Sequence, residues 1–214
     1  MALIKTASFL DGIGGSTGNT TYIRTRYGTS LRDRTAPRDK KTPAQMEARL
    51  RMKLVGIAWR KLTIAQANLW REYASRQSAP ALQQPFPANV YFNQLGLKFL
   101  QVNPDSPLPL EPPATAFGGD GLTATATAVT GGIQITASQA NTSGVVTEIL
   151  LQPMRTVHRR AYAEKYRTAE FVRFGASLST MIPAVPGVYA VAIRFTRAAT
   201  GQAGGLVELG MLEV

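Results

Sequence analysis

The sequence contains no cysteine and a single histidine, His158, among its 214 residues. Without cysteine, a disulfide framework and a thiolate nucleophile are excluded, and one histidine leaves no spacing typical of a zinc site. No pair of carboxylates stands in an apolar loop, and no serine or threonine has a base nearby in the sequence to activate it. The sequence therefore predicts a protein that is not an enzyme and has no catalytic residue, metal ligand or cofactor.

Long apolar runs are also missing. The opening residues, MALIKTASFLDG, are interrupted by Lys5 and Ser8, and no segment approaches the ~18 apolar residues of a membrane span. A Walker loop is excluded because Gly18 precedes Asn19 and not the required lysine, and Thr17 breaks a dinucleotide fingerprint. We expect a soluble protein made inside a cell, with no membrane partner and no small-molecule substrate.

Negative charge is scarce in the amino-terminal part of the chain. Residues 1–80 hold 15 Lys or Arg and 5 Asp or Glu, whereas residues 81–214 hold 9 and 8. The net charge of +11 therefore belongs almost wholly to a cationic segment that is attached to a nearly neutral body.

Residues 1–41 are predicted to form an extended basic arm with no core of its own. In TYIRTRYG, alternation places Tyr22, Arg24 and Arg26 on one side of a strand and the residues between them on the other. Gly28 ends this strand, and TSLRDR is a candidate for a returning strand. The arm combines many cations with large apolar side chains.

Residues 42–102 are predicted to form a helical subdomain. Thr42 with Gln45, and Thr63 with Gln66, fit capping boxes that begin helices over roughly 43–61 and 63–75. A third helix, NVYFNQLGLKFLQV, is apolar around its circumference with Lys98 as its only charge, so we expect it to be buried on several sides.

The first of these helices has two apolar stripes, and two stripes predict two packing partners. The first stripe contains Met46, Leu50, Leu54 and Ile57, the second contains Met52, Val55 and Trp59, and Arg49, Lys53 and Arg60 lie between them.

Residues 103–114 contain five prolines and are predicted to be a stiff linker at a domain boundary. Over residues 115–214 the apolar period changes to two, with six or seven short segments separated by turn residues. This pattern predicts an antiparallel β-sandwich of the immunoglobulin or fibronectin type III kind. Tyr189 is a candidate for the corner tyrosine of such a sandwich, or an ordinary strand tyrosine. The predicted fold class is α+β.

The amino-terminal half also resembles a known family. The matching motifs are Gly-Asn-Thr-x-Tyr-x-Arg-x-Arg-x-Gly from Gly18 to Gly28, Thr-Pro-Ala-Gln from Thr42, the helix end from Ala58 to Thr63, Ala65-Gln66-x-x-x-Trp70, and an Asn-aromatic helix from Asn89 to Phe92. In these motifs the chain is similar to a family of poorly characterised proteins encoded in bacteriophages and prophages. The resemblance covers residues 1–100 and implies a place in a virion or in its assembly. Asp33 and Asp39, acids within the basic arm, depart from the family pattern.

Two functions remain open for the arm. In the first, the chain is a structural virion protein whose arm and helices bind neighbouring subunits, namely other virion proteins and copies of itself. In the second, it is a nucleic-acid-binding protein whose arm lies on phosphates without reading sequence, packaged DNA being the partner. The interleaved Tyr22, Ile23 and Tyr27 favour the first, because a purely phosphate-binding arm needs no large apolar side chains. The expected location is the virion, after synthesis in the host cytoplasm.

The residues expected to contact these partners are Tyr22, Arg24, Arg26, Tyr27, Arg32, Arg34, Arg38, Lys40, Lys41, Arg49, Lys53 and Arg60. A second basic cluster, residues 155–167, surrounds His158 and includes Tyr162 and Tyr166. It is either a solvated loop or a contact for nucleic acid or an acidic neighbour.

Overall fold

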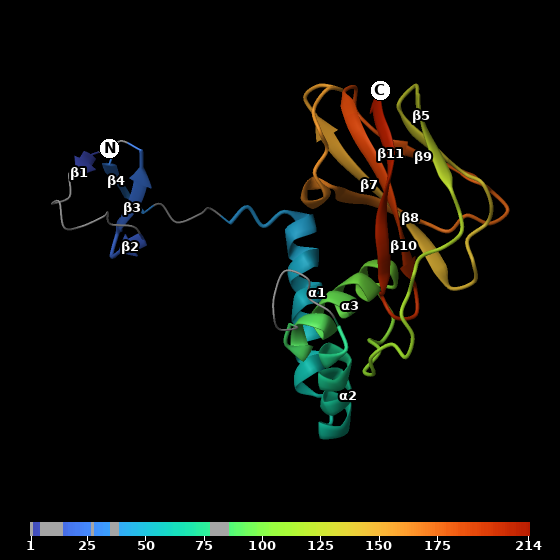
Figure 1. The fold of residues 1–214 in the computed structure, drawn as a ribbon, viewed down its shortest axis with the longest axis horizontal. Coiled ribbons are helices and arrows are strands. Elements are labelled where there is room, and N and C mark those ends of the chain that lie inside the picture. The colour runs from blue at the N-terminus through green and yellow to red at the C-terminus, as the bar shows by residue number, and fades with distance from the viewer. Residues whose placement is uncertain (1, 5–14, 27, 35–38, 78–85) are drawn as a thin grey trace. The chain divides into compact units, whose positions relative to one another are not determined.

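The chain is described by a computed structural model that covers residues 2–4, 15–26, 28–34, 39–77 and 86–214 (Figure 1). By its internal contacts the chain divides into two compact units, Met1–Gln45 and Met46–Val214. The α+β class is confirmed: the described residues form three helices and three antiparallel sheets.

The first unit contains a small four-stranded sheet. Its strands are β1 (Ala2–Ile4), β2 (Gly15–Thr17), β3 (Thr20–Thr25) and β4 (Gly28–Asp33), arranged in the order β1-β4-β3-β2. The predicted strand and its returning strand are present as the β3–β4 hairpin. The hairpin also pairs with β1 and β2, so the described residues of this segment include a sheet. Gly18 and Gly28, with φ of 58° and 126°, permit the backbone reversals that this folding requires.

The three helices are α1 (Pro43–Arg60), α2 (Ile64–Ser75) and α3 (Ala88–Val102), and the second unit begins within α1, at Met46. Both predicted capping boxes are present: Gln45 N donates to Thr42 Oγ1, and Gln66 N donates to Thr63 Oγ1, with each glutamine side chain accepting from the threonine amide. The helical core contains Val55, Trp70, Phe92, Phe99 and Leu100. The rings of Trp70 and Phe92 meet edge to face with centroids 5.2 Å apart.

The carboxyl-terminal part consists of two facing sheets (Figure 1). The strands are β5 (Ala124–Val129), β6 (Gly132–Ala137), β7 (Val145–Met154), β8 (Arg167–Val172), β9 (Ser179–Pro183), β10 (Val188–Arg197) and β11 (Ala203–Glu213), with a short 3-10 helix at Ala163–Lys165. One sheet has the order β5-β6-β9 and the other β11-β10-β7-β8. Their core includes Ile133, Ile135, Ile149, Val191 and Ile193, which alternate with outward-facing residues as the period of two predicted.

The helices and the sheets are joined by direct contacts. Asn103 Nδ2 at the end of α3 donates to the carbonyl of Ala198 at 2.8 Å, and the β10–β11 turn approaches α3 at Gly201. The Pro-rich residues 103–114 lie over the helices, where Leu108 packs on the helical core and Trp70 Nε1 donates to Leu110 O at 2.8 Å. This segment therefore packs against the helices that precede it, the division by internal contacts falls near residue 45, and the domain boundary at 103–114 stays a prediction.

Candidate functional site

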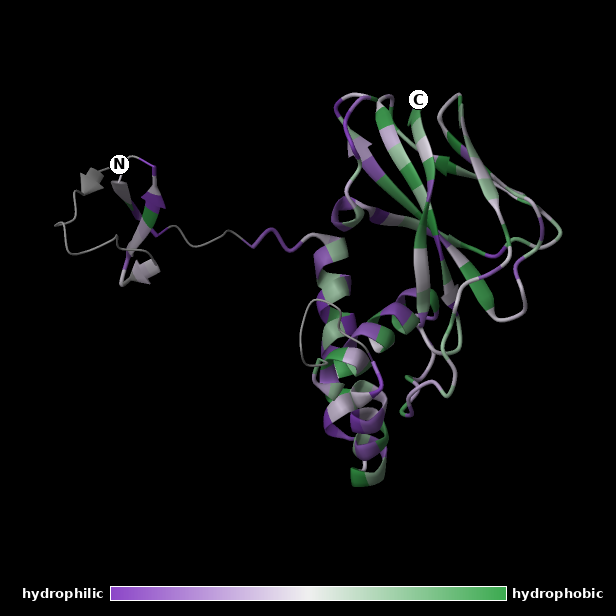
Figure 2. Ribbon diagram, viewed as in Figure 1, coloured by the Kyte–Doolittle hydropathy of each residue, from purple (hydrophilic) through white to green (hydrophobic). Residues whose placement is uncertain are grey.

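Helix α1 carries an exposed apolar stripe. Of its residues, only Val55 is fully buried, and it packs in the helical core beside Ala58 and Trp59. Met46, Leu50 and Leu54 recur at four-residue spacing and are 42–55% exposed. Figure 2 shows the mixture of hydrophobic and hydrophilic residues along this helix. Of the predicted second stripe, Val55 and Trp59 thus meet the core, whereas Met52 is 54% exposed. Of the first stripe, Met46, Leu50 and Leu54 are exposed and Ile57 is half-buried.

The exposed stripe leads into an apolar groove of about 650 Å³. Leu54 belongs to both features, Ala58 follows it by four residues on α1, and Lys61 lies just past the end of the helix. The remaining apolar walls are Leu100 of α3 and Pro104, Pro107, Leu108 and Leu110 of the Pro-rich segment. Stripe and groove together form one surface, which we call the α1 face.

Cations border the α1 face. Lys53, Arg60 and Lys61 are exposed, and Arg60 Nε donates to the carbonyl of Gly56 at 3.2 Å. Arg49 lies beside Met46, with its guanidinium 4.0 Å from the Met46 sulfur. The predicted contact residues Arg49, Lys53 and Arg60 therefore accompany the exposed apolar stripe, and Asp105 is the one carboxylate that lines the groove.

The basic residues of the first unit do not share one face of the sheet. Arg24 pairs across the hairpin with Thr29, whereas Arg32 pairs with Thr21, and the alternation of strands places these two arginines on opposite faces. Tyr22 lies on the same face as Arg24. The remaining predicted contacts are exposed residues outside the paired strands, Arg26, Arg34, Lys40 and Lys41, while Tyr27 and Arg38 lie outside the described residues.

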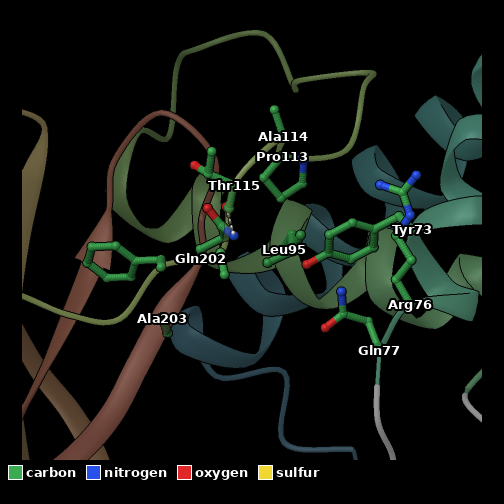
Figure 3. A pocket seen from close by; sticks show the side chains of 11 residues that line it. Tyr73, Arg76, Gln77, Leu95, Pro113, Ala114, Thr115, Gln202 and Ala203 are labelled. Atoms are coloured by element: carbon green, nitrogen blue, oxygen red, sulfur yellow. Dashed lines mark hydrogen bonds between the residues drawn. The ribbon is translucent and has the colours of Figure 1, made fainter.

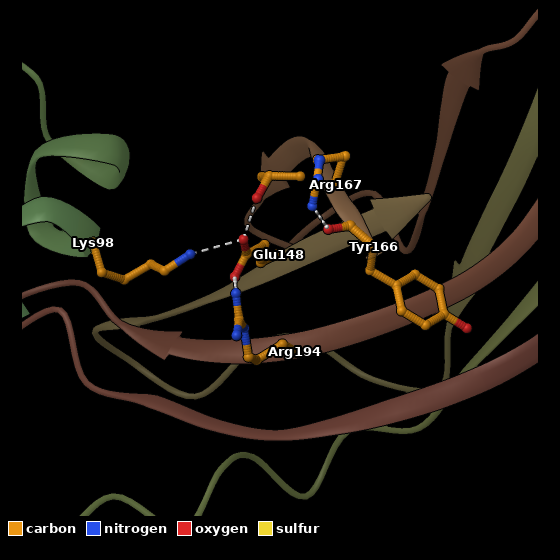
Figure 4. Close-up of polar contacts among 6 residues, drawn as sticks. Lys98, Glu148, Tyr166, Arg167 and Arg194 are labelled. Carbon is orange, nitrogen blue, oxygen red and sulfur yellow. Dashed lines mark hydrogen bonds and ion pairs between the residues drawn. The ribbon is translucent and has the colours of Figure 1, made fainter. Parts of the chain in front are cut away.

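A buried charge cluster of Lys98, Glu148 and Arg194 joins α3 to the outer face of the β11-β10-β7-β8 sheet (Figure 4). Glu148 on β7 has a side chain with no exposed surface, and it accepts from Lys98 Nζ at 2.9 Å and from Arg194 Nε at 2.9 Å. The Thr168 hydroxyl donates to the same carboxylate. The sequence analysis did not predict the pairing of Lys98 with Glu148. The available signal was that Lys98 is the only charged residue of α3 and Glu148 the only charged residue of β7.

No family model, curated protein or solved structure matches the chain. Within the described residues, no group of three or more His, Asp and Glu side chains could hold a metal ion. No helix in the described ranges has the length and apolar character needed to cross a membrane.

A separate pocket of about 380 Å³ lies between the end of α2 and the start of β11 (Figure 3). Burial raises the pKa of Tyr73 on one wall, the proximity of Tyr91 acts in the same direction, and a side-chain hydrogen bond with Gln202 acts against them. On another wall, Gln202 Nε2 donates to Thr115 O at 2.9 Å, and its Oε1 accepts from Thr200. The hydrogen-bonding groups of Gln202 therefore hold neighbouring segments together and offer no nucleophile.

The buried cluster of Lys98, Glu148 and Arg194 makes the stability of the fold depend on pH in the acid range. Burial alone would raise the pKa of Glu148, but hydrogen bonds from Thr168 and Lys98 and the charges of Lys98 and Arg194 lower it below its ordinary 4.5. A carboxylate with a lowered pKa stabilises the fold fully above its ordinary pKa, and this contribution is lost as the pH falls through the lowered value.

We therefore expect the melting temperature to fall on acidification below about pH 4.5, the ordinary pKa of the group. The Glu148→Gln variant should have a lower melting temperature at neutral pH and a flatter acid dependence. Some dependence will remain, because hydrogen bonds from Thr142, Asn141 and Gly121 lower the pKa of Asp120 despite the opposing effect of its burial. Parallel curves for the two proteins across the acid range would contradict the assignment to Glu148.

Proposed function

We propose that the chain is a structural component of a bacteriophage virion that binds neighbouring subunits through the α1 face. The observation that carries this proposal is the continuity between the exposed Met46, Leu50 and Leu54 and the apolar groove at the end of the same helix. Large contiguous apolar surfaces on soluble domains mark interaction sites, and apolar residues at i and i+4 beside a groove suit a docked helix. The bacteriophage setting rests on the family resemblance of residues 1–100.

The charges around the α1 face indicate what occupies it. Lys53, Arg60 and Lys61 border the apolar surface, and the first 45 residues of the same chain are also predominantly basic. A second α1 face, or the basic segment of the chain itself, would bring like charges together. The occupant is therefore an amphipathic helix of another virion protein, with apolar residues flanked by carboxylates.

The order of the strands supports a fibronectin type III-like arrangement for the carboxyl-terminal part. Numbered from β5, strands one, two and five form one sheet, and strands seven, six, three and four form the other, as in that fold. The Tyr189 hydroxyl at the start of β10 donates to Val185 O at 3.1 Å, which is the contact of a tyrosine corner.

A second candidate function is binding of nucleic acid by the basic amino-terminal segment. Its support is the excess of Lys and Arg over Asp and Glu in residues 1–45. The placement of Arg24 and Arg32 on opposite faces of the hairpin weakens it, because a phosphate backbone could engage only one of these faces at a time.

The virion proposal predicts that the double variant Leu50→Asp/Leu54→Asp is depleted from purified particles. Each buried leucine contributes about 1.5–3 kcal/mol, so loss of both should weaken subunit binding by a factor of roughly a hundred or more. Incorporation is measured by quantitative mass spectrometry of particles made with the variant as the only source of the chain. Thermal unfolding of the purified variant should be unchanged, because both side chains are exposed in the second unit.

Ile64→Asp is the matched control. Ile64 is 81% exposed on α2 and does not line the groove, so this variant should be incorporated normally. Normal incorporation of the double variant would contradict the role of the α1 face, and absence of the unaltered chain from particles would contradict the virion assignment. Self-association of the purified chain that Leu50→Asp/Leu54→Asp abolishes would identify a second copy as the occupant.

A further inference from the structure

A second strongly basic surface lies far from α1 in the sequence. Residues 155–167, here called the basic loop, connect β7 to β8 and include the first residue of β8. They contain five Arg or Lys and one carboxylate, Glu164, together with the only histidine of the chain. All five cations are exposed, at positions 155, 159, 160, 165 and 167.

The basic loop packs against the outer face of the β11-β10-β7-β8 sheet. Tyr166 is buried against Leu150, Ala190 and Ala192, and Ala161 packs on the same cluster. The backbone amide of Tyr162 donates to Gln152 Oε1 at 3.1 Å, and Gln152 is itself buried. These contacts hold the backbone of the loop against the sheet, so ligand binding need not first order it.

The basic loop and α3 occupy neighbouring parts of one sheet face. Glu148 and Gln152 are four residues apart on β7 and point to the same side. Lys98 of α3 donates a hydrogen bond to Glu148, and the Tyr162 amide of the basic loop donates one to Gln152. The loop therefore completes the cover of a face that would otherwise be exposed.

The positive charge of the basic loop is not neutralised within the described part of the chain. None of its five cations lies within 4.0 Å of a carboxylate oxygen there. Arg167 donates to the carbonyls of Glu164 and Tyr166, and Lys165 Nζ lies 4.8 Å from the centroid of the Tyr162 ring. Arg155, Arg159 and Arg160 have no such partners among the described residues, so their guanidinium groups are available to an external anion.

We propose that the basic loop binds the phosphate backbone of nucleic acid without reading its sequence. Guanidinium groups match phosphate geometry, and interfaces with nucleic acid are more polar and more positive than those between proteins. An acidic protein partner is less well suited, because the loop exposes only Val157 and Tyr162 as large apolar side chains and offers no apolar centre for a protein interface. The exposed Tyr162 adds a ring on which an unpaired base can stack.

The test uses the full chain and fluorescently labelled random-sequence DNA, as a duplex and as a single strand, with anisotropy measured over a range of salt concentrations. The unaltered protein should bind with an affinity that falls with salt, with a slope of about −3 for three to four duplex phosphate contacts. Arg159→Glu/Arg160→Glu should weaken binding about tenfold or more and flatten that slope. Arg159→Lys/Arg160→Lys should retain binding, because lysine keeps the charge.

Two further variants make the outcome decisive. Arg71→Glu/Arg173→Glu carries the same charge change at exposed positions outside the loop. It measures the effect of overall charge alone and should leave the affinity for DNA within about twofold of that of the unaltered protein. If Arg24→Glu/Arg32→Glu abolishes binding and the loop variant does not, the proposal is overturned and the site belongs to the amino-terminal sheet. Binding of polyglutamate, but not DNA, through Arg159 and Arg160 would also overturn it. Equal melting temperatures of the variants and the unaltered protein exclude unfolding as the cause of any loss of binding.

Discussion

The Glu148→Gln variant is expected to lose about 3 kcal/mol of unfolding free energy. The substitution removes the counter-charge of Lys98 and Arg194, whose side chains are only 16% and 28% exposed. Breaking a buried ion pair by removing one partner is costly because the remaining charges stay partly desolvated. Burial already lowers the pKa of Lys98, so the variant should move that ammonium further toward its neutral form. Urea unfolding at neutral pH measures the loss.

Two further variants separate the buried cluster from charge in general. Glu170→Gln removes an exposed carboxylate on β8 and should change the unfolding free energy by no more than about 0.5 kcal/mol. Lys98→Met should cost less than Glu148→Gln, because Arg194 and Thr168 still satisfy the carboxylate. If Glu148→Gln behaves like Glu170→Gln, the cluster does not stabilise the attachment of α3 to the sheet.

Gly201→Ala is expected to destabilise the second unit by about 3 kcal/mol or more. Gly201 has φ of 73°, a conformation that L-residues adopt at a cost, and it stands in the turn between β10 and β11. A Cβ atom at this position would overlap Leu95 O and would lie 2.8 Å from Phe99 N, both backbone atoms of α3. Because a helix backbone does not yield locally, α3 and the β10–β11 turn must move apart. Denaturant unfolding and amide exchange in α3 report the two consequences.

Gly131→Ala is the matched control for backbone strain alone. Gly131 also has positive φ, at 87°, but nothing lies within 4 Å of an added Cβ. Its cost should be about 1 kcal/mol, and amide exchange in α3 should be unaffected. Equal losses for the two alanine variants would contradict the close approach of the turn to α3.

Local patterns predicted the elements well. Each capping box joins residues three positions apart, and the β3–β4 hairpin follows from alternating residues interrupted by Gly28. The two apolar stripes of α1 predicted two partners for that helix. The stripes alone did not indicate which one packs inside the chain, because that choice depends on α2, α3 and the Pro-rich segment.

The arrangement of the elements was less predictable. Five prolines in residues 103–114 indicated a linker, yet Leu108 packs on the helical core and the Leu110 carbonyl accepts a hydrogen bond from Trp70. The amino-terminal residues indicated an arm, yet β1 and β2 extend the hairpin into a sheet. In both places the sequence pattern reports local backbone preference, whereas the outcome depends on which distant surface is complementary.

The sequence by itself determined the α+β class, the ends of the first two helices, the concentration of positive charge and the period of the strands, because each depends on residues within a few positions of one another. Only the tertiary structure decided that Lys98 meets Glu148 fifty residues away, that the basic loop lies on the outer sheet face, and that Met46, Leu50 and Leu54 remain exposed. Each of these features depends on which distant surfaces meet and exclude water and which do not. They therefore depend on pairs of elements and leave no periodic signal in either element alone.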